Sequence, residues 1–274
     1  MRSRALLLVP LLLLLTGCAP LTAGETLSAA VSALPGVQNA RALSGQGDAA
    51  GIAVTMTTTA TTEQADAVVR AWAKAAPDTA STLTLTVGTR VGSLTATSPV
   101  DDRLDGVVAD WWTLSALGRS AVTADYGAVR YEVYPAEGAT ATGPAALAAL
   151  ADRVRAAVPH PHADTVALRA AAVSVTSTDG DYDSAVLRAL QPAFAAAGAA
   201  ATLDLTVSSV PVVQFTADST VAFEKLLDAL PFSTGAVVQL SDESGIVATL
   251  RAGQCVHSGD TALWAYWGGP KACG

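Results

Sequence analysis

The sequence predicts an α+β fold built from six repeated helix–strand–strand units. Apolar residues at the helical spacing i, i+3, i+4 and i+7 recur along the chain, and each such segment is followed by two short strand-like runs. The expected helices begin near residues 25, 62, 103, 143, 184 and 220, which are 36 to 41 residues apart. A fixed period of this length is typical of a repeated supersecondary unit.

The clearest unit is Thr220–Leu250. Its helical stripe consists of Phe223, Leu226, Leu227 and Leu230. Pro231 ends the helix because proline lacks the N–H that a helix interior needs. The apolar runs Ala236–Leu240 and Ile246–Leu250 follow, joined by a polar turn with a glycine, and this pattern predicts a β-hairpin.

The five earlier units repeat this helical stripe. The apolar positions, unit by unit, are Leu27, Ala30, Val31 and Leu34; Ala65, Val68, Val69 and Trp72; Leu104, Val107, Val108 and Trp111; Leu147, Leu150, Val154 and Val158; Leu187, Leu190 and Phe194. Thr22 and Glu25 form a capping box before the first helix. Pro144 opens the fourth helix, and Pro192 is expected to kink the fifth.

Two strands are expected after each of these helices. They cover Val37–Leu43 and Gly51–Thr58; Ser81–Val87 and Val91–Thr97; Ser120–Ala124 and Ala128–Tyr134; Ala201–Val207 and Val212–Ala217. The fourth unit is the weakest copy, since Thr165–Thr176 contains strand-forming residues without a clear turn between them.

Twelve strands exceed the roughly ten that a strongly twisted open sheet usually holds. The units are therefore expected to pair into up to three ferredoxin-like modules with antiparallel sheets, at 25–100, 101–180 and 181–250. Polar, turn-forming stretches at Ser98–Asp102 and Asp179–Asp183 mark the expected boundaries. The alternative is one long sheet that curls around its helices.

The first 17 residues have the form of an export signal. Arg2 and Arg4 precede the apolar run Ala5–Leu15, which is too short to span a bilayer as a helix. The run leads into Leu15-Thr16-Gly17-Cys18, which resembles the lipobox of bacterial lipoproteins. That resemblance implies cleavage before Cys18 and a diacylglycerol on its sulfur, so the mature chain is expected on the extracytoplasmic face of the cell membrane. The alternative is an ordinary signal peptide with a chance cysteine.

Residues 18–24 then form a short tether, which reaches roughly 25 Å at most. Tandem helix–strand–strand units in a lipoprotein resemble the BON modules of bacterial envelopes at the level of fold. Because no BON glycine signature is matched, the lipid binding of that family is not carried over to this chain.

The mature chain is acidic. Loss of Arg2 and Arg4 with the signal leaves 14 basic and 24 acidic residues, a net charge of −10. Such a chain, without a basic run, gains little from counterion release and is not expected to bind nucleic acid. Anionic lipid headgroups also repel it, so the lipid on Cys18 is expected to hold it at the membrane.

The two remaining cysteines, Cys255 and Cys273, are an even pair in an exported chain, which favours a disulfide. The bond would contribute roughly 3 kcal/mol in the chain-entropy model. A zinc site is the alternative, but the two cysteines and His257 offer too few closely spaced ligands.

The tail 251–274 departs from the repeat and is interpreted as a disulfide-stapled C-terminal cap. Trp264, Tyr266 and Trp267 lie within the expected disulfide loop. Their aromatic rings either cover the edge of the last sheet or form a binding surface.

The stretch Asp179–Asp183 resembles the start of a calcium loop. An EF-hand loop needs glycine at its sixth position and glutamate at its twelfth, where this chain has Ser184 and Leu190. A turn leading into the N-cap of the fifth helix is the favoured interpretation.

Two other polar clusters are candidates for a site. They are His160-Pro161-His162 with Asp164, and the aspartates Asp101, Asp102 and Asp105 at the start of the third helix. Histidine is a common metal ligand, but a solvated loop is the favoured interpretation. The aspartates suit the positive end of the helix dipole.

No nucleophile, metalloprotease or phosphate-loop motif is present, and three histidines leave little material for general-base chemistry. We therefore expect a non-enzymatic, lipid-anchored extracytoplasmic protein that binds or scaffolds an envelope partner, without catalytic residues, cofactor or metal. One alternative is a lipoprotein that captures a small molecule or glycan between modules. The other is an envelope hydrolase with an unrecognised site.

Overall fold

The protein was analysed as a computed structural model that describes residues 22–43, 50–75, 81–88, 92–97, 103–125, 127–135, 143–178, 184–198, 201–230, 237–251 and 257–266. Within these ranges the helices are α1 (Ala23–Ser32), α2 (Thr62–Ala75), α3 (Leu104–Leu117), α4 (Pro144–Ala157), α5 (Ser184–Ala189), α6 (Gln191–Ala196), α7 (Thr220–Ala229) and α8 (Thr261–Tyr266). None of these described helices is long and apolar enough to cross a membrane.

The strands of the described chain form one sheet of thirteen strands, which lie side by side in the order of the sequence. They are β1 (Val37–Leu43), β2 (Ala50–Met56), β3 (Ser81–Val87), β4 (Gly92–Thr97), β5 (Ser120–Asp125), β6 (Ala128–Val133), β7 (Thr165–Arg169), β8 (Val173–Ser177), β9 (Thr202–Val207), β10 (Val212–Thr216), β11 (Val237–Asp242), β12 (Gly245–Arg251) and β13 (His257–Gly259). The α+β class and the helix–strand–strand order are therefore confirmed.

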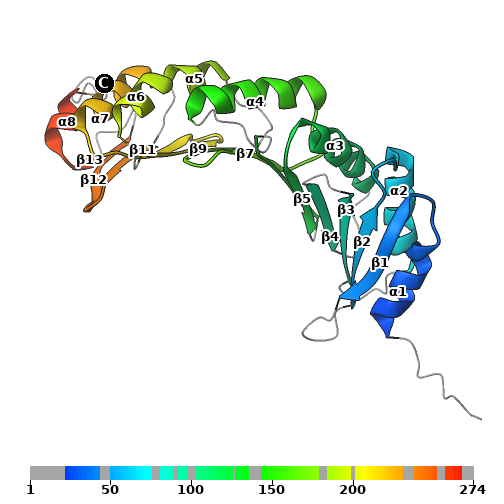
Figure 1. The fold of residues 1–274 in the computed structure, drawn as a ribbon. Helices are drawn as coiled ribbons and strands as arrows, with labels where there is room; N and C mark the ends of the chain where they lie inside the picture. Colours follow the sequence, from blue (N-terminus) through cyan, green and yellow to red (C-terminus); the bar gives the residue numbers. More distant parts are fainter. Residues whose placement is uncertain are drawn as a thin grey trace, which may run out of the picture.

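The division into up to three ferredoxin-like modules is not confirmed. Strand β4 pairs with β5 across the first expected boundary, and β8 pairs with β9 across the second. The sheet is continuous and open, as in the alternative of one long sheet, but it does not curl around its helices, because the helices lie on the outside of the curve (Figure 1). Figure 1 shows it as an arch with the helices on the convex side and the strands on the concave side.

Layer widths account for this long, curved sheet. An α-helix is about 10 Å across with its side chains, and two strands occupy about 9.6 Å. One helix therefore covers the two strands of its own unit, and units can be added without leaving sheet uncovered. The slightly wider helix layer lies on the outside of the curve, as Figure 1 shows.

Antiparallel hairpins alternate with parallel pairs along the sheet. The two strands of a unit are antiparallel, whereas the strands on either side of a connecting helix are parallel, as in β2–β3 and β6–β7. The parallel pair joined by one crossover therefore runs opposite to the parallel pair joined by the next crossover, while all helices cover the same face of the sheet. The hand of the crossover must alternate, although such connections are right-handed in about 98% of cases. The left-handed crossovers are accepted because only one face of the sheet is buried, and a helix on the other face would have no core to pack on.

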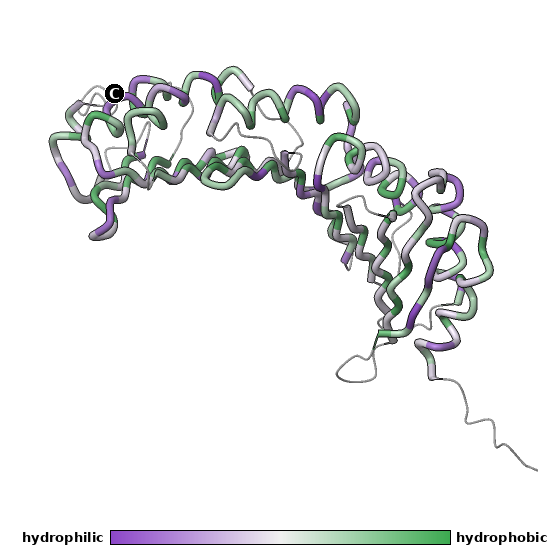
Figure 2. The backbone as a smooth tube through the Cα atoms, in the orientation of Figure 1, coloured by the Kyte–Doolittle hydropathy of each residue, from purple (hydrophilic) through white to green (hydrophobic). Residues whose placement is uncertain are grey.

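The core lies between the helices and this one face. Val54, Leu85, Leu94, Val122 and Tyr131 are paired across neighbouring strands and are at most 1% exposed. The alternation of hydrophobic and hydrophilic residues along the strands is visible in Figure 2. No described helix covers the residues on the opposite face of the sheet (Figure 1).

Local sequence features confirm several expected element ends. Thr22 and Glu25 form the expected capping box of α1. The fifth helix is divided into α5 and α6, with Pro192 in the first turn of α6, where its missing N–H costs nothing. The hairpin of the fourth unit has its turn at residues 170–172, between β7 and β8.

Candidate functional site

The concave face of the sheet carries small polar, small apolar and charged side chains. One row of paired residues crosses it from β1 to β12: Asn39, Thr55, Thr86, Ser93, Ala121, Glu132, Ala167, Thr176, Thr206, Val212, Val237 and Arg251. On β3 and β4 the outward residues are all threonine or serine. This part of the face offers hydroxyl groups and no charge.

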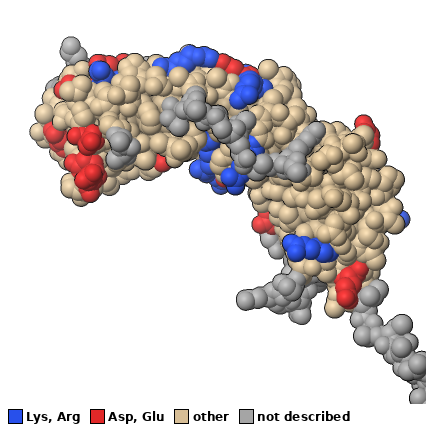
Figure 3. Space-filling view, in the orientation of Figure 1, with Lys and Arg blue, Asp and Glu red and all other residues tan. Residues whose placement is uncertain are grey.

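Charged residues gather at the middle of the face. Arg130, Glu132 and Tyr134 alternate along β6 and its end, with Arg119 on one side and Arg169 on the other. Glu132 Oε1 forms an ion pair with Arg130 Nη2 at 3.0 Å and accepts a hydrogen bond from Arg169 Nε at 3.3 Å. Figure 3 shows basic side chains on the concave side near the bend of the arch. Three arginines around one glutamate leave two surplus positive charges in an acidic protein.

Tyr134 connects this cluster. Its hydroxyl donates to Glu132 Oε2 at 2.9 Å, and the guanidinium carbon of Arg119 lies 5.1 Å from its ring centroid. Burial acts to raise the pKa of Glu132, but the Tyr134 hydrogen bond and the Arg169 and Arg130 charges outweigh it and lower that pKa. Burial and the bond to Glu132 raise the pKa of Tyr134, so its hydroxyl stays a donor.

A cavity of about 320 Å³ lies beside Arg119 and Tyr134. It is lined by Thr86, Gly92, Ser93, Arg119, Ser120, Ala121 and Tyr134. Pockets for small ligands start at about 300 Å³. The cavity therefore has room for one small polar group, and hydroxyls, a guanidinium and a phenol are the chemistry that it presents.

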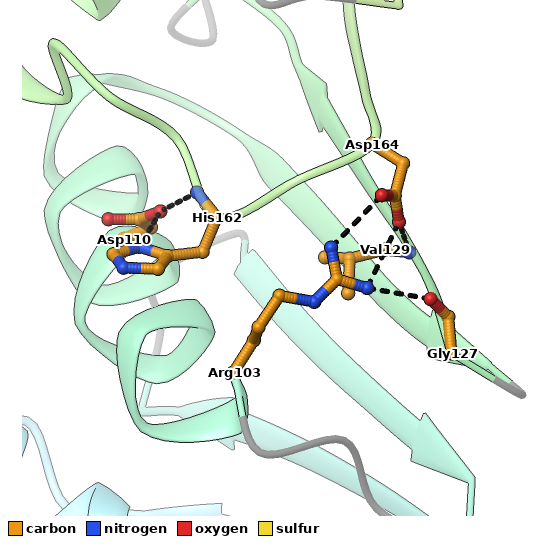
Figure 4. Close-up of polar contacts among 6 residues, drawn as sticks. All are labelled: Arg103, Asp110, Gly127, Val129, His162 and Asp164. Atoms are coloured by element: carbon orange, nitrogen blue, oxygen red, sulfur yellow. Dashed lines mark hydrogen bonds and ion pairs between the residues drawn. The ribbon is translucent and has the colours of Figure 1, made fainter.

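A second polar cluster joins α3 to the loop before β7. The carboxylate of Asp110, on α3, accepts a hydrogen bond from the Tyr131 hydroxyl at 2.7 Å and from the His162 backbone N–H at 2.8 Å. His162 Nδ1 lies 3.0 Å from the same oxygen (Figure 4). Burial and then the bond to Asp110 raise the pKa of Tyr131, which keeps it protonated.

An ion pair anchors the other end of the same loop. Arg103 donates to both oxygens of Asp164, at 3.0 and 3.3 Å, and to the Gly127 carbonyl at 2.6 Å (Figure 4). Asp164 also accepts from the Val129 N–H at 2.7 Å. The side chains of Arg103 and Asp164 are 36% and 51% exposed, so the pair itself contributes at most about 1 kcal/mol. Its role is to set where β7 begins beside β6.

The histidine cluster has the contacts of a structural clamp. A Cβ placed on Gly106 would lie 2.5 Å from the His162 ring, so the ring packs directly on α3. His160 is exposed on the loop, apart from these contacts. Among the described residues no group of three or more metal-ligating side chains converges.

Of the three aspartates at the start of the third helix, Asp105 lies within the described residues. Asp105 forms an ion pair with Arg70 of α2 at 2.7 Å, and Arg70 also binds Asp66 at 2.8 Å. This network ties α2 to α3. Asp101 and Asp102, and the candidate calcium loop at 179–183, lie outside the described residues.

The C-terminal aromatic residues lie against the last unit. Trp264 is half-buried and packs against the core, and Leu263 beside it is buried. The Tyr266 hydroxyl donates to Asp228 of α7 at 3.0 Å, while its side chain stays exposed. The described part of the tail thus contacts α7 and the core, and the disulfide-stapled cap stays a prediction. Trp267, Cys255, Cys273 and Cys18 lie outside the described residues, so the disulfide and the lipid anchor stay predictions.

No protein-family model, curated protein or solved structure matches this chain. The candidate site therefore rests on its own geometry. Sequence reasoning missed Asp110 and the arginine cluster. The alternation Arg130, Glu132, Tyr134 on a predicted strand was a signal for a shared polar face, but the contributions of Arg119 and Arg169 depend on strand order.

Proposed function

We propose that this chain is a non-enzymatic, lipid-anchored protein of the extracytoplasmic cell envelope, which binds or scaffolds its partner on the concave face of the sheet. A lipid on Cys18 holds it at the membrane. The observation that carries the proposal is the sheet face that no described helix covers, with its central cluster of Arg119, Arg130 and Arg169.

Two physical arguments support the choice of this face. Repeat proteins present their concave surfaces to partners, because these surfaces are extended and rigidly supported by the stacked units. The face also concentrates positive charge within a chain of net charge −8, or −10 without Arg2 and Arg4, so the charge is segregated to one region. A tether of roughly 25 Å keeps the face within the envelope layer next to the membrane.

The cavity favours a second candidate, a lipoprotein that captures a small molecule or glycan. Ser93 belongs to β4 and Ala121 to β5, which flank the expected boundary between the first two modules. The two candidates share the same face and differ in the size of the ligand.

Site-specific photo-crosslinking in intact cells tests the proposal. A photoreactive residue is placed at Thr95, which is outward on β4, or at the control position Thr113, which is exposed on the helix side of the arch. We expect adducts from Thr95 and few from Thr113. Equal labelling, or labelling from Thr113 only, contradicts binding by the concave face.

The anchor is tested separately with Cys18→Ser. We expect the variant chain in the culture medium, because the chain has lost the sulfur that carries the lipid. Retention of this variant in the membrane fraction would exclude the lipid anchor.

A further inference from the structure

Resting on the proposed function, we infer that the concave face binds a carboxylated polysaccharide, with one carboxylate of the glycan on Arg119 in the cavity beside Tyr134. The inference combines three observations: Arg119 forms no ion pair with a described residue, hydroxyl groups line the cavity, and neighbouring strands are evenly spaced.

Arg119 is the arginine available to a ligand. Arg130 and Arg169 both bind Glu132, whereas Arg119 is exposed, contacts the Tyr134 ring and forms no ion pair with a described residue. A guanidinium over an aromatic ring keeps N–H donors at its perimeter, and this fork matches the two oxygens of a carboxylate. Tyr134, tied to Glu132, holds the arginine at the mouth of the cavity.

The surroundings of Arg119 suit a sugar chain. Thr86 and Ser93 line the cavity, and the row continues through Thr55 on β2. Neighbouring strands are about 4.8 Å apart, which is close to the length of one pyranose residue in an extended chain. Each strand crossed therefore offers a hydroxyl or small side chain to successive sugars, while the carboxylate of one sugar binds Arg119.

The same surface favours a glycan over a protein or a nucleic acid as the partner. The large hydrophobic side chains that are exposed in the described chain are Val210, Val221, Ile246 and Tyr266, and none lies on β2–β7. Protein interfaces are commonly centred on several buried aromatic, apolar or arginine anchors. Nucleic acid binding needs many phosphate contacts, and the central cluster of Arg119, Arg130, Arg169 and Glu132 has two surplus positive charges.

The test measures binding of fluorescent oligogalacturonate to the full chain in detergent. The matched ligand is the methyl ester of the same oligosaccharide, which has the same sugars without charge. The variants are Arg119→Gln; Ser93→Glu, which keeps the arginine but places a carboxylate in the cavity that competes for it and repels an acidic ligand; and the control Arg153→Gln on the exposed side of α4. Thermal melting followed by circular dichroism checks that each variant is folded.

We expect wild type and Arg153→Gln to bind the acid and not the ester. We expect Arg119→Gln and Ser93→Glu to bind the acid at least about ten-fold more weakly than wild type. Wild-type affinity in Arg119→Gln, or equal binding of acid and ester, overturns the inference. Binding of a polyol-phosphate polymer in place of oligogalacturonate also overturns it and assigns the site to phosphate. If Thr95 is crosslinked in cells but no glycan binds, the proposed function stands and the glycan assignment falls.

Discussion

Replacement of Asp110 by alanine tests the clamp between α3 and the loop before β7. Asp110 is 8% exposed, and its carboxylate accepts from Tyr131, which is 1% exposed, and from the His162 N–H. Alanine leaves both donors without an acceptor, and each unsatisfied buried donor costs about 1–3 kcal/mol. Since His162 is partly solvated, we expect a loss of about 2–4 kcal/mol of unfolding free energy.

Urea denaturation followed by circular dichroism measures this loss. The control is Asp105→Ala on the same helix, whose carboxylate is 61% exposed and forms an ion pair with Arg70, so its loss is expected to cost less than about 1 kcal/mol. A double-mutant cycle with Tyr131→Phe isolates the buried bond, with an expected coupling of about 1–2 kcal/mol. If Asp110→Ala unfolds within about 0.5 kcal/mol of wild type, or the cycle is additive, the clamp does not stabilise the fold.

Three further predictions follow from the layers, the arginine cluster and the tail. Leu85→Ala, at 0% exposure, is expected to lose about 2–5 kcal/mol, whereas Thr84→Ala on the open face of the same strand loses less than about 1 kcal/mol in the same urea assay; similar values would contradict a one-sided core. Because the pKa of Glu132 is lowered in the folded state, its stabilising contribution is present above the usual value of about 4.3 and is lost as the pH falls through the folded value, so the melting temperature of Glu132→Gln should depend less on pH below about 5. Thiol labelling of the native mature chain is expected to find neither Cys255 nor Cys273 reactive, and labelling of both would refute the disulfide.

Much of the architecture is local and could be predicted from the chain. The stripe of Val68, Val69 and Trp72 is buried as expected, and the strand Ser81–Val87 has the predicted bounds. Each unit contains its own helix signal and hairpin signal, so neighbouring residues decide its secondary structure.

The association of the units was not local. The pairing of β4 with β5 depends on how a helix layer matches two strands in width, and no sequence pattern reports that match. The limit of about ten strands suggested separate modules, but it holds for sheets that do not curl. Here the one-sided helix layer bends the sheet into an arch, which allows it to continue.

The sequence by itself determined the repeat, the alternation that buries one face of the inner strands such as β3 and β4, and the acidic charge, because these properties depend on residues close together in the chain. The tertiary structure alone decided that Arg119, Tyr134 and Arg169 share one surface, and that Asp110 meets Tyr131 and His162. Hydrogen bonds and ring contacts act over a few ångströms, and these residues become neighbours only when successive units place their strands side by side.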